Sequence, residues 1–240
     1  MSNIEKFLEM VQESDNIVFF GGAGVSTESG IPDFRSVDGL YNQKYDYPPE
    51  TILSHTFYMR HTEEFYRFYR DKMLCLDAKP NVTHQKLAEL EAAGKVKAVI
   101  TQNIDGLHQM AGSRQVLELH GSVHRNYCQK CGKGFDAEYI LKSGTEIPLC
   151  DACGGKIKPD VVLYEEGLNQ QTLEDAVFYI SHADVLIIGG TSLAVYPAAG
   201  LIDYYRGNKL VLINKSTTSM DGRADLLIQA GLGEVFSQIR

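Results

Sequence analysis

The sequence predicts an α/β protein in which one parallel sheet is covered by helices on both faces. Short and very apolar segments at 16–20, 96–101 and 184–188 are typical of buried strands. Two of them run directly into glycine-rich turns, and helical segments alternate with the strands. This alternation is typical of a parallel sheet, in which ligands bind at the carboxyl ends of the strands.

The remaining elements follow from periodicity and turn residues. Apolar residues at positions 4, 7, 8 and 11 predict an amphipathic first helix. We expect mostly loop with one short helix over 36–61. Further helices are expected over 63–76, 84–93 and 170–180, from Pro197 onward, and at the C-terminus. Further strands are expected at 116–120, 160–164, 209–213 and 226–229.

Composition bounds the class of protein. The 240 residues fit one α/β domain with a small insertion, and 44% apolar and 22% charged residues are ordinary for a globular protein. A formal net charge of −8 argues against general binding to nucleic acid or to anionic membranes. The sequence has no long apolar span and no signal-peptide pattern. We therefore expect a cytoplasmic protein, a monomer, with its cysteines reduced or bound to metal.

Four cysteines form two C-x2-C pairs, Cys128 with Cys131 and Cys150 with Cys153, in a segment poor in apolar runs. Four thiolates at this spacing suit a tetrahedral zinc ion that leaves no open position, which predicts a structural zinc module over 122–158. Two disulfides or a redox pair are the alternatives. A reducing location disfavours the first, and the presence of two matched pairs disfavours the second. Cys75 lies among apolar residues, and we expect it to be a core thiol.

A glycine-rich segment follows the strand at 16–20. Gly22 to Gly30 is a candidate phosphate loop, because small residues let the backbone approach a diphosphate closely. The next residues, Ile31 to Arg35, combine an apolar residue, a proline, an acid, an aromatic ring and a guanidinium. This mixture suits an enclosed site for a charged, partly aromatic ligand. An ordinary surface turn remains the alternative.

These residues, with others downstream, resemble the sirtuin family. The matching segments are Gly22-Ala-Gly-Val-Ser-Thr-Glu-Ser-Gly-Ile-Pro-Asp-Phe-Arg35, Thr101-Gln-Asn-Ile-Asp105, His120-Gly121, the four cysteines, Gly190-Thr-Ser-Leu193 and Asn214. The resemblance covers nearly the whole chain and is strongest to short bacterial members. It implies one catalytic domain over 1–240 that is Rossmann-like, with a small zinc-binding lobe. A flexible loop and helices of that lobe would fall within 36–80, and NAD and an acyl-lysine peptide would bind in the cleft.

The resemblance also implies a reaction that consumes NAD and yields nicotinamide, O-acyl-ADP-ribose and free lysine. Such a reaction needs a base, and His120 ends an apolar strand where its ring can reach a cleft. An unperturbed histidine titrates near ~6.5, which suits removal of a proton from a ribose hydroxyl. We predict His120 and Asn103 as the catalytic residues.

The same resemblance assigns a larger set of residues to the cofactor. Asp105 and Ile104 are implied at the nicotinamide carboxamide, with Ile31 and Phe34 beside them, although Asp105 could also cap a helix. The full predicted cofactor set is Gly22, Ala23, Gly24, Thr27, Ile31, Asp33, Phe34, Arg35, Gln102, Asn103, Ile104, Asp105, His120, Gly190, Thr191, Ser192, Asn214, Gly231 and Leu232.

Two segments resemble the clamp that holds the peptide as an added strand, 161–166 and 193–196. The predicted substrate residues are Val161, Leu163, Tyr164, Glu165, Glu166 and Val195. The family commonly has Phe-Gly-Glu where this chain has Tyr164-Glu165-Glu166. The extra carboxylate leaves the peptide contacts open and would favour basic residues beside the target lysine.

The choice of acyl group is predicted from one helix. Sirtuins that prefer acidic acyl groups have a tyrosine followed three residues later by an arginine, whereas here Tyr66 is followed by Tyr69. Arg67 and Arg70 are near but out of register, which favours neutral acyl groups such as acetyl.

Several functions remain open from the sequence. The first is an NAD-dependent lysine deacetylase, and a deacylase for longer acyl chains is a variant of it. The second is a mono-ADP-ribosyltransferase that uses the same NAD site. The third is a non-enzymatic sensor of NAD or ADP-ribose with a zinc ribbon that binds nucleic acid. His120 favours the first, because ADP-ribosyl transfer alone does not need that base. The acidic composition and the set of Asn103, Asp105 and His120 disfavour the third.

Overall fold

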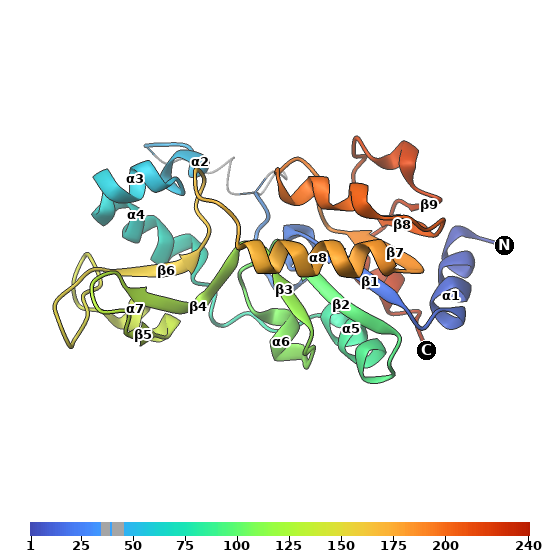
Figure 1. Ribbon diagram of the computed structural model, residues 1–240, viewed down its shortest axis with the longest axis horizontal. Coiled ribbons are helices and arrows are strands. Elements are labelled where there is room, and N and C mark those ends of the chain that lie inside the picture. Colours follow the sequence, from blue (N-terminus) through green and yellow to red (C-terminus); the bar gives the residue numbers. More distant parts are fainter. Residues whose placement is uncertain (35–38, 40–45) are drawn as a thin grey trace.

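The chain forms two lobes of unequal size (Figure 1). The structure is a computed structural model that describes residues 1–34, 39 and 46–240. The larger lobe contains a six-stranded sheet and the smaller lobe a three-stranded sheet. Both chain termini lie at the outer end of the larger lobe, away from the smaller one. No described helix is long and apolar enough to span a bilayer.

All neighbouring strands of the large sheet run parallel, as predicted. The strands are β1 (Ile17–Gly21), β2 (Val96–Thr101), β3 (Val116–Glu118), β7 (Val185–Gly189), β8 (Leu210–Ile213) and β9 (Leu226–Ile228). Their order in the sheet is β3-β2-β1-β7-β8-β9. The chain proceeds from β1 to β2 on one side, and β7 then pairs with the other side of β1. This reversal is the place where open α/β sheets bind ligands.

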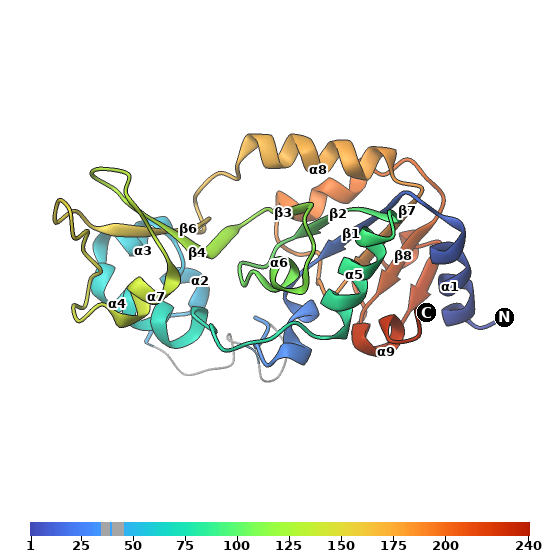
Figure 2. The ribbon, with the colours of Figure 1, turned by 90° about the horizontal axis from the view of Figure 1, so that it is seen from below.

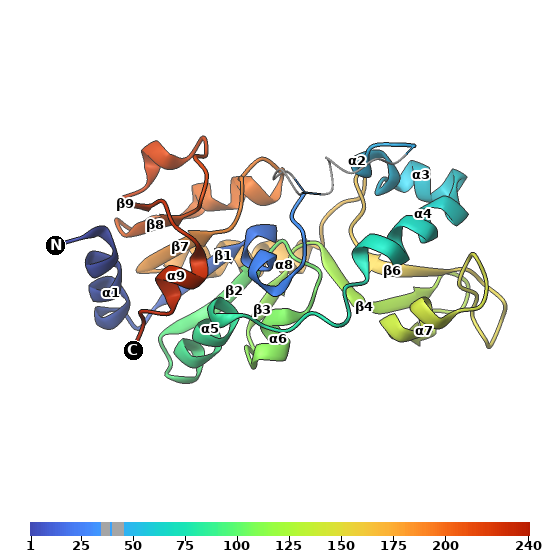
Figure 3. The same ribbon diagram turned by 180° about the vertical axis from the view of Figure 1, so that it is seen from behind.

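Helices cover both faces of the large sheet. One face carries α1 (Asn3–Glu13), α5 (Val82–Ala92), α6 (Leu107–Ala111) and α9 (Leu232–Phe236), as Figure 3 shows. The other carries α8 (Gln170–His182) and the 3-10 helix η5 (Ala198–Tyr204), and α8 lies opposite α5 and α9 in Figure 2.

Strand β1 is apolar throughout because both of its faces are covered. On one face, Phe19 belongs to the same buried cluster as Phe7 and Phe236. The ring centroids of Phe19 and Phe236 lie 5.9 Å apart. Val18 and Phe20 belong to the cluster on the other face. Successive side chains of a strand point to opposite faces, so a strand covered on both sides needs apolar residues at every position.

The small lobe is built from distant parts of the chain. Strand β4 (Gly121–Cys128) pairs antiparallel with β5 (Gly134–Phe135) and with β6 (Ile157–Val161). Helices α2 (Pro49–Ile52), α3 (His55–Arg60), α4 (Thr62–Phe68) and α7 (Ala137–Lys142) complete it, with the π-helical turn η4 (Tyr69–Met73). Its core is rich in buried aromatic residues. In the described residues three short 3-10 turns remain, η1 (Ala23–Val25), η2 (Thr27–Ser29) and η6 (Asp221–Arg223).

One predicted strand was two residues too long, and another was wrong. The strand predicted over 116–120 ends at Glu118, and the chain then turns at His120 into the small sheet. At Gly121 φ is +76°, and a Cβ atom would lie 1.9 Å from the Asp160 carbonyl oxygen, so glycine is required at this turn. The strand predicted over 160–164 is instead β6, which ends at Val161 and belongs to the small sheet. Its buried residues alternate, and Pro159 is tolerated because β6 is an edge strand.

Helix boundaries also differed from the predictions. The helix predicted over 63–76 is α4 followed by the wider turn η4, and it ends at Met73. The described part of 36–61 contains two short helices, α2 and α3, rather than one. The helix expected from Pro197 is a 3-10 helix that begins at Ala198. The other predicted helices and strands end within about two residues of the observed ones, which is the usual uncertainty of element ends. No bounds were predicted for α6, α7, β4 and β5.

Candidate active site

A cavity of about 580 Å³ lies where the two lobes meet. It opens beside the carboxyl ends of β1, β2 and β7, which are neighbours in the sheet. Except for Gly231 and the four cysteines, every predicted site residue that the structure describes lines this cavity. Gly231 lies between two lining residues, Ala230 and Leu232. Arg35 lies outside the described residues.

One end of the cavity is formed by loops that hold one another in place. The backbone N–H of Gly24 donates to the carbonyl of Gly190 at 2.8 Å. A Cβ atom on Gly24 would lie 2.8 Å from the Gly190 Cα, so this approach requires glycine. The Thr191 N–H donates to Asn214 Oδ1 at 3.2 Å, and Asn214 Nδ2 donates back to the Thr191 carbonyl at 3.1 Å. Gln102 Nε2 donates to Thr191 Oγ1 at 3.0 Å. The loops after β1, β2, β7 and β8 therefore form one rigid surface.

Asp105 and Asn103 meet at a serine that the sequence did not single out. Ser26 Oγ donates to Asp105 Oδ2 at 2.6 Å and accepts from Asn103 Nδ2 at 3.0 Å. The other oxygen, Asp105 Oδ1, accepts from the Leu107 N–H at 2.9 Å at the start of α6. Asp105 thus lines the cavity and also caps a helix. Ser26 lies inside the glycine-rich segment, but a small loop residue gives no sign of its partner across the site.

Among the described residues, the His120 ring makes one hydrogen bond. Its Nδ1 lies 2.9 Å from the Gln102 carbonyl oxygen. A carbonyl only accepts, so Nδ1 carries the proton and Nε2 keeps a free lone pair. Burial lowers the pKa of His120, and the Gln102 hydrogen bond offsets this only in part. The ring is therefore neutral and able to accept a proton near neutral pH.

Apolar residues of the small lobe line the other part of the cavity. Met73, Leu76 and Val123 lie there with the predicted residues Val161 and Leu163. The prediction that Cys75 is a core thiol was wrong, because it follows η4, is only half-buried and lines the cavity. Burial raises the pKa of the Cys75 thiol, so it remains protonated.

Arginine is absent from the described residues that line the cavity. Tyr66 and Tyr69 are fully buried outside the cavity, and the Tyr66 hydroxyl donates to the Ile157 carbonyl. Arg70 donates four hydrogen bonds to the end of α7 and the loop after it. Its acceptors are the Ile140, Thr145 and Glu146 carbonyls and Ser143 Oγ, at 2.6–3.0 Å. The structure therefore places Arg70 away from the site.

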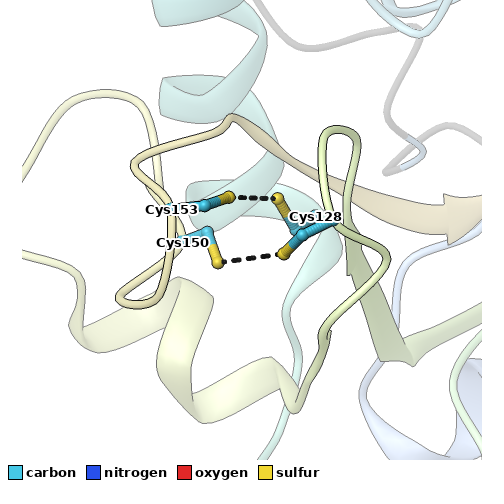
Figure 4. A group of neighbouring side chains, drawn as sticks. Cys128, Cys150 and Cys153 are labelled. Carbon is cyan, nitrogen blue, oxygen red and sulfur yellow. Dashed lines mark hydrogen bonds between the residues drawn. The ribbon is translucent and has the colours of Figure 1, made fainter.

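The four cysteines converge in the small lobe, and Figure 4 shows Cys128, Cys150 and Cys153 turned toward one another. Their sulfur atoms lie within 4.8 Å of one another, with Cys128 and Cys153 at 3.5 Å and Cys131 and Cys150 at 3.7 Å. A tetrahedral zinc ion with bonds of about 2.3 Å sets its sulfur ligands about 3.8 Å apart. A disulfide would bring two sulfurs to about 2.05 Å, and all four cysteines are free thiols. The Lys130 N–H also points to Cys128 Sγ at 3.4 Å, which favours a thiolate.

The comparison with known proteins agrees with this site. A sequence model of the Sir2 family matches residues 22–197. The chain belongs to the Sir2 family. A protein of Clostridium acetobutylicum named as an NAD-dependent protein deacetylase is 61% identical over 241 residues, which is 100% of this chain and 98% of that protein. A Clostridium tetani protein of the same name is 58% identical, with the same coverage of both chains.

Solved Sir2 structures superpose on nearly the whole chain. One holds a deacetylated p53 peptide and 3′-O-acetyl-ADP-ribose. It has a TM-score of 0.91 and 42% identity, and the match covers 98% of this chain and 96% of that one. A second, with a p53 peptide and NAD⁺, has a TM-score of 0.88 and 42% identity over 100% of this chain and 97% of that one. The Rossmann-like large lobe with a small cysteine-bearing lobe is thus the Sir2 fold.

Proposed function

We propose that this protein is an NAD-dependent protein-lysine deacetylase, in which NAD is consumed and one zinc ion is structural. The observation that carries the proposal is the placement of His120, Asn103 and Asp105 in one cavity with the glycine-rich loop. Relatives of 61% and 58% identity bear the same activity in their names.

Each wall of the cavity has a proposed role. The residues after β1, β7 and β8, with the Gly231–Leu232 turn, bind the diphosphate and adenosine end of NAD. Asp105 and Ile104, beside Ile31 and Phe34, bind the nicotinamide carboxamide. Residues 161–166 and 193–196 hold the peptide as an added strand.

The chemistry follows from what these side chains can do. The acetyl oxygen of the substrate attacks C1′ of the nicotinamide ribose, and nicotinamide leaves with the bonding electrons. His120 Nε2 then takes the proton of a ribose hydroxyl, whose oxygen attacks the imidate carbon. Addition of water and loss of the lysine amine give O-acetyl-ADP-ribose and free lysine. Asn103, fixed by Ser26, orients the ribose and the water.

The zinc ion holds the small lobe together rather than reacting. All four thiolates are used as ligands, so no coordination position is left for substrate. We regard 1–240 as one catalytic domain with the zinc module at 122–158. The strands that flank this module, β4 and β6, begin at Gly121 and end at Val161. The helices predicted within 36–80 complete the small lobe, and the flexible loop predicted in this range falls largely outside the described residues.

The partners are acetylated proteins or peptides, and neither nucleic acid nor a membrane is needed. The net charge of −8 supports this. We propose a cytoplasmic monomer.

Incubation with NAD and an acetyl-lysine peptide, followed by mass spectrometry, tests the proposal. A deacetylase gives nicotinamide, free lysine peptide and O-acetyl-ADP-ribose. A peptide heavier by one ADP-ribosyl group would indicate a mono-ADP-ribosyltransferase, and unchanged NAD would indicate a sensor. A parallel series of longer acyl chains tests the alternative of a deacylase with a wider range.

A further inference from the structure

Two described residues other than glycine have a positive φ angle, and they lie on the two segments that we propose to hold the peptide. Glu165 has φ +76° and Leu193 has φ +54°. Side chains with a Cβ atom rarely adopt this conformation, and residues held in it cluster at active sites and ligand clamps. Leu193 is buried, which gives its side chain a packing role, whereas Glu165 is exposed and lines the cavity.

The carboxylate of Glu165 is fixed by uncharged groups. Its Oε2 accepts from the Thr56 N–H at 2.9 Å and from Thr56 Oγ1 at 2.7 Å. These two bonds anchor the side chain at the start of α3, so it is ordered before any substrate arrives. They also lower the pKa of Glu165, and the acid is therefore ionised at neutral pH.

The neighbouring Glu166 provides a contrast within the same segment. It accepts from Lys158 Nζ at 3.1 Å and lies 2.8 Å from His55 Nδ1, and it also accepts from the Leu163 N–H at 2.9 Å. Its charge is thus compensated inside the protein. In the described part of the chain, Glu165 has no lysine, arginine or histidine within ion-pair distance. A preorganised negative charge without an ion-pair partner among the described residues therefore remains at the cavity, with Arg60 and His55 near enough to add to the lowering of its pKa.

We propose that Glu165 is a specificity-determining residue, whose carboxylate selects substrates with a lysine or arginine beside the acyl-lysine. The proposal rests on the deacetylase function proposed above. A basic side chain next to the target would find a fixed anion that needs no further ordering. An acidic side chain would meet repulsion from the same group.

The alternative is that Glu165 only stabilises the start of α3, since a carboxylate is favourable at a helix N-terminus. Glu165→Gln separates the two roles. Glutamine keeps the shape and the acceptor oxygen for Thr56 but removes the charge. Glu174→Gln is the matched control, because Glu174 lies on α8 outside the cavity and the substitution changes the net charge equally.

The experiment compares acetyl-lysine peptides that differ only in one neighbouring residue, Lys, Gln or Glu, placed on either side of the target in turn. With the wild type we expect kcat/KM to change about two- to fivefold for each charge change, the size typical of an exposed charge pair. Glu165→Gln should bring the Lys-to-Glu ratio close to one, while Glu174→Gln should leave it at the wild-type value. The wild-type ratio should also shrink from low to high salt.

A wild-type ratio of one on both sides of the target, or a ratio that Glu165→Gln leaves unchanged, overturns the proposal. If Glu165→Gln does not fold, the salt dependence of the wild-type ratio decides in its place, and a salt-independent ratio overturns the proposal. Failure of the proposed deacetylase function gives a distinct result, because none of the peptides would then be deacetylated in the presence of NAD.

Discussion

His120 can act as a base because its geometry leaves one ring nitrogen free. Nδ1 is committed to the Gln102 carbonyl, so Nε2 is the only nitrogen that can take a proton. His120→Ala should lower deacetylation by about 10²–10⁴-fold, the range typical for loss of a general base. NAD affinity should remain within a few-fold of the wild type, because the ring does not hold the diphosphate. Steady-state kinetics and calorimetric titration with NAD measure the two effects.

The pKa of His120 gives a pH dependence with a definite sign. Burial lowers this pKa, so the base stays neutral and active below the usual histidine range. The kcat/KM for peptide should therefore be flat around neutral pH and fall only when pH drops below about 6.5, the ordinary histidine pKa. An acid limb centred above that value would contradict the burial argument.

Acetyl-lysine should be a far better substrate than succinyl-lysine. A succinyl carboxylate must shed water on entering the apolar part of the cavity, which is costly without a partner. Arg70, the arginine nearest in register, is engaged in four hydrogen bonds elsewhere, and Lys72, which lines the cavity, is paired with Asp71. The two acyl groups on one peptide backbone should be compared by kcat/KM. Equal efficiency would mean that a cation other than Arg70 reaches the acyl group.

Among single residues, the sequence predicted those that belong to long motifs, such as Asn103 to Asp105. It could not predict Ser26, because the serine acquires its role only when the loops after β1 and β2 come together. Nor could it separate Glu165 from Glu166, because their difference lies in partners contributed by distant residues.

Among the elements, the glycine-rich loop is held in place by the N-cap residue of a neighbouring helix, α5. Asn81 Oδ1 caps α5 by accepting from the Thr83 N–H at 3.0 Å, while Nδ2 donates to the Val25 carbonyl at 2.8 Å and to Ser29 Oγ at 3.0 Å. Asn81→Asp keeps the cap but removes both donors. Loss of two hydrogen bonds at ~1 kcal/mol each should raise the KM for NAD about tenfold or more.

The matched control is Asn169→Asp. Asn169 caps α8 through Oδ1, which accepts from the Thr172 N–H at 2.9 Å, and it is exposed. Aspartate caps equally well, so this variant should keep the wild-type KM for NAD. If both variants behave alike, Asn81 acts as a helix cap and not as a brace for the loop.

The zinc module should be inseparable from folding of the small lobe. Purified protein should contain about one zinc per chain, the number set by one four-cysteine site. Cys150→Ser removes a buried ligand and should lower thermal stability and activity together, because metal binding is coupled to folding. Metal analysis and thermal unfolding measure this. An active, folded and metal-free protein would contradict it.

Elements of the large sheet were predictable because burial on both faces demands unbroken apolar runs, as in Ile17 to Phe20. The small sheet was not, because β4 has exposed positions, irregular pairing and a polar sequence. The apolar residues after β6 then misled the prediction, since Leu163 is buried in a linker between the lobes rather than in a strand.

The stability of the whole molecule should depend on two buried histidines between α5 and α6. The rings of His84 and His108 lie 4.6 Å apart, and neither nitrogen of His108 has a partner among the described residues. Burial lowers the pKa of His108 to about 3 and that of His84 to about 4. In the unfolded chain both histidines bind a proton near pH ~6.5, whereas in the folded protein they stay neutral to lower pH. The free energy of unfolding is therefore highest above pH ~6.5 and decreases as pH falls below it.

Urea unfolding at pH 7.5 and pH 5 tests this contribution. Each histidine should lower the free energy of unfolding of the wild type by up to about 1.4 kcal/mol for each pH unit below ~6.5. His108→Leu should reduce this loss, because the apolar side chain has no proton to bind in either state. An equal pH dependence in the wild type and the variant would show that other groups govern acid unfolding.

Together, the two lobes are expected to transfer an acetyl group from lysine to ADP-ribose. A peptide with a ¹³C-labelled acetyl group and an excess of NAD tests this most directly. We predict that the label is recovered on ADP-ribose, in an amount equal to the nicotinamide released and to the free lysine peptide formed. Label recovered as free acetate while NAD remains intact would show simple hydrolysis and would contradict the central claim.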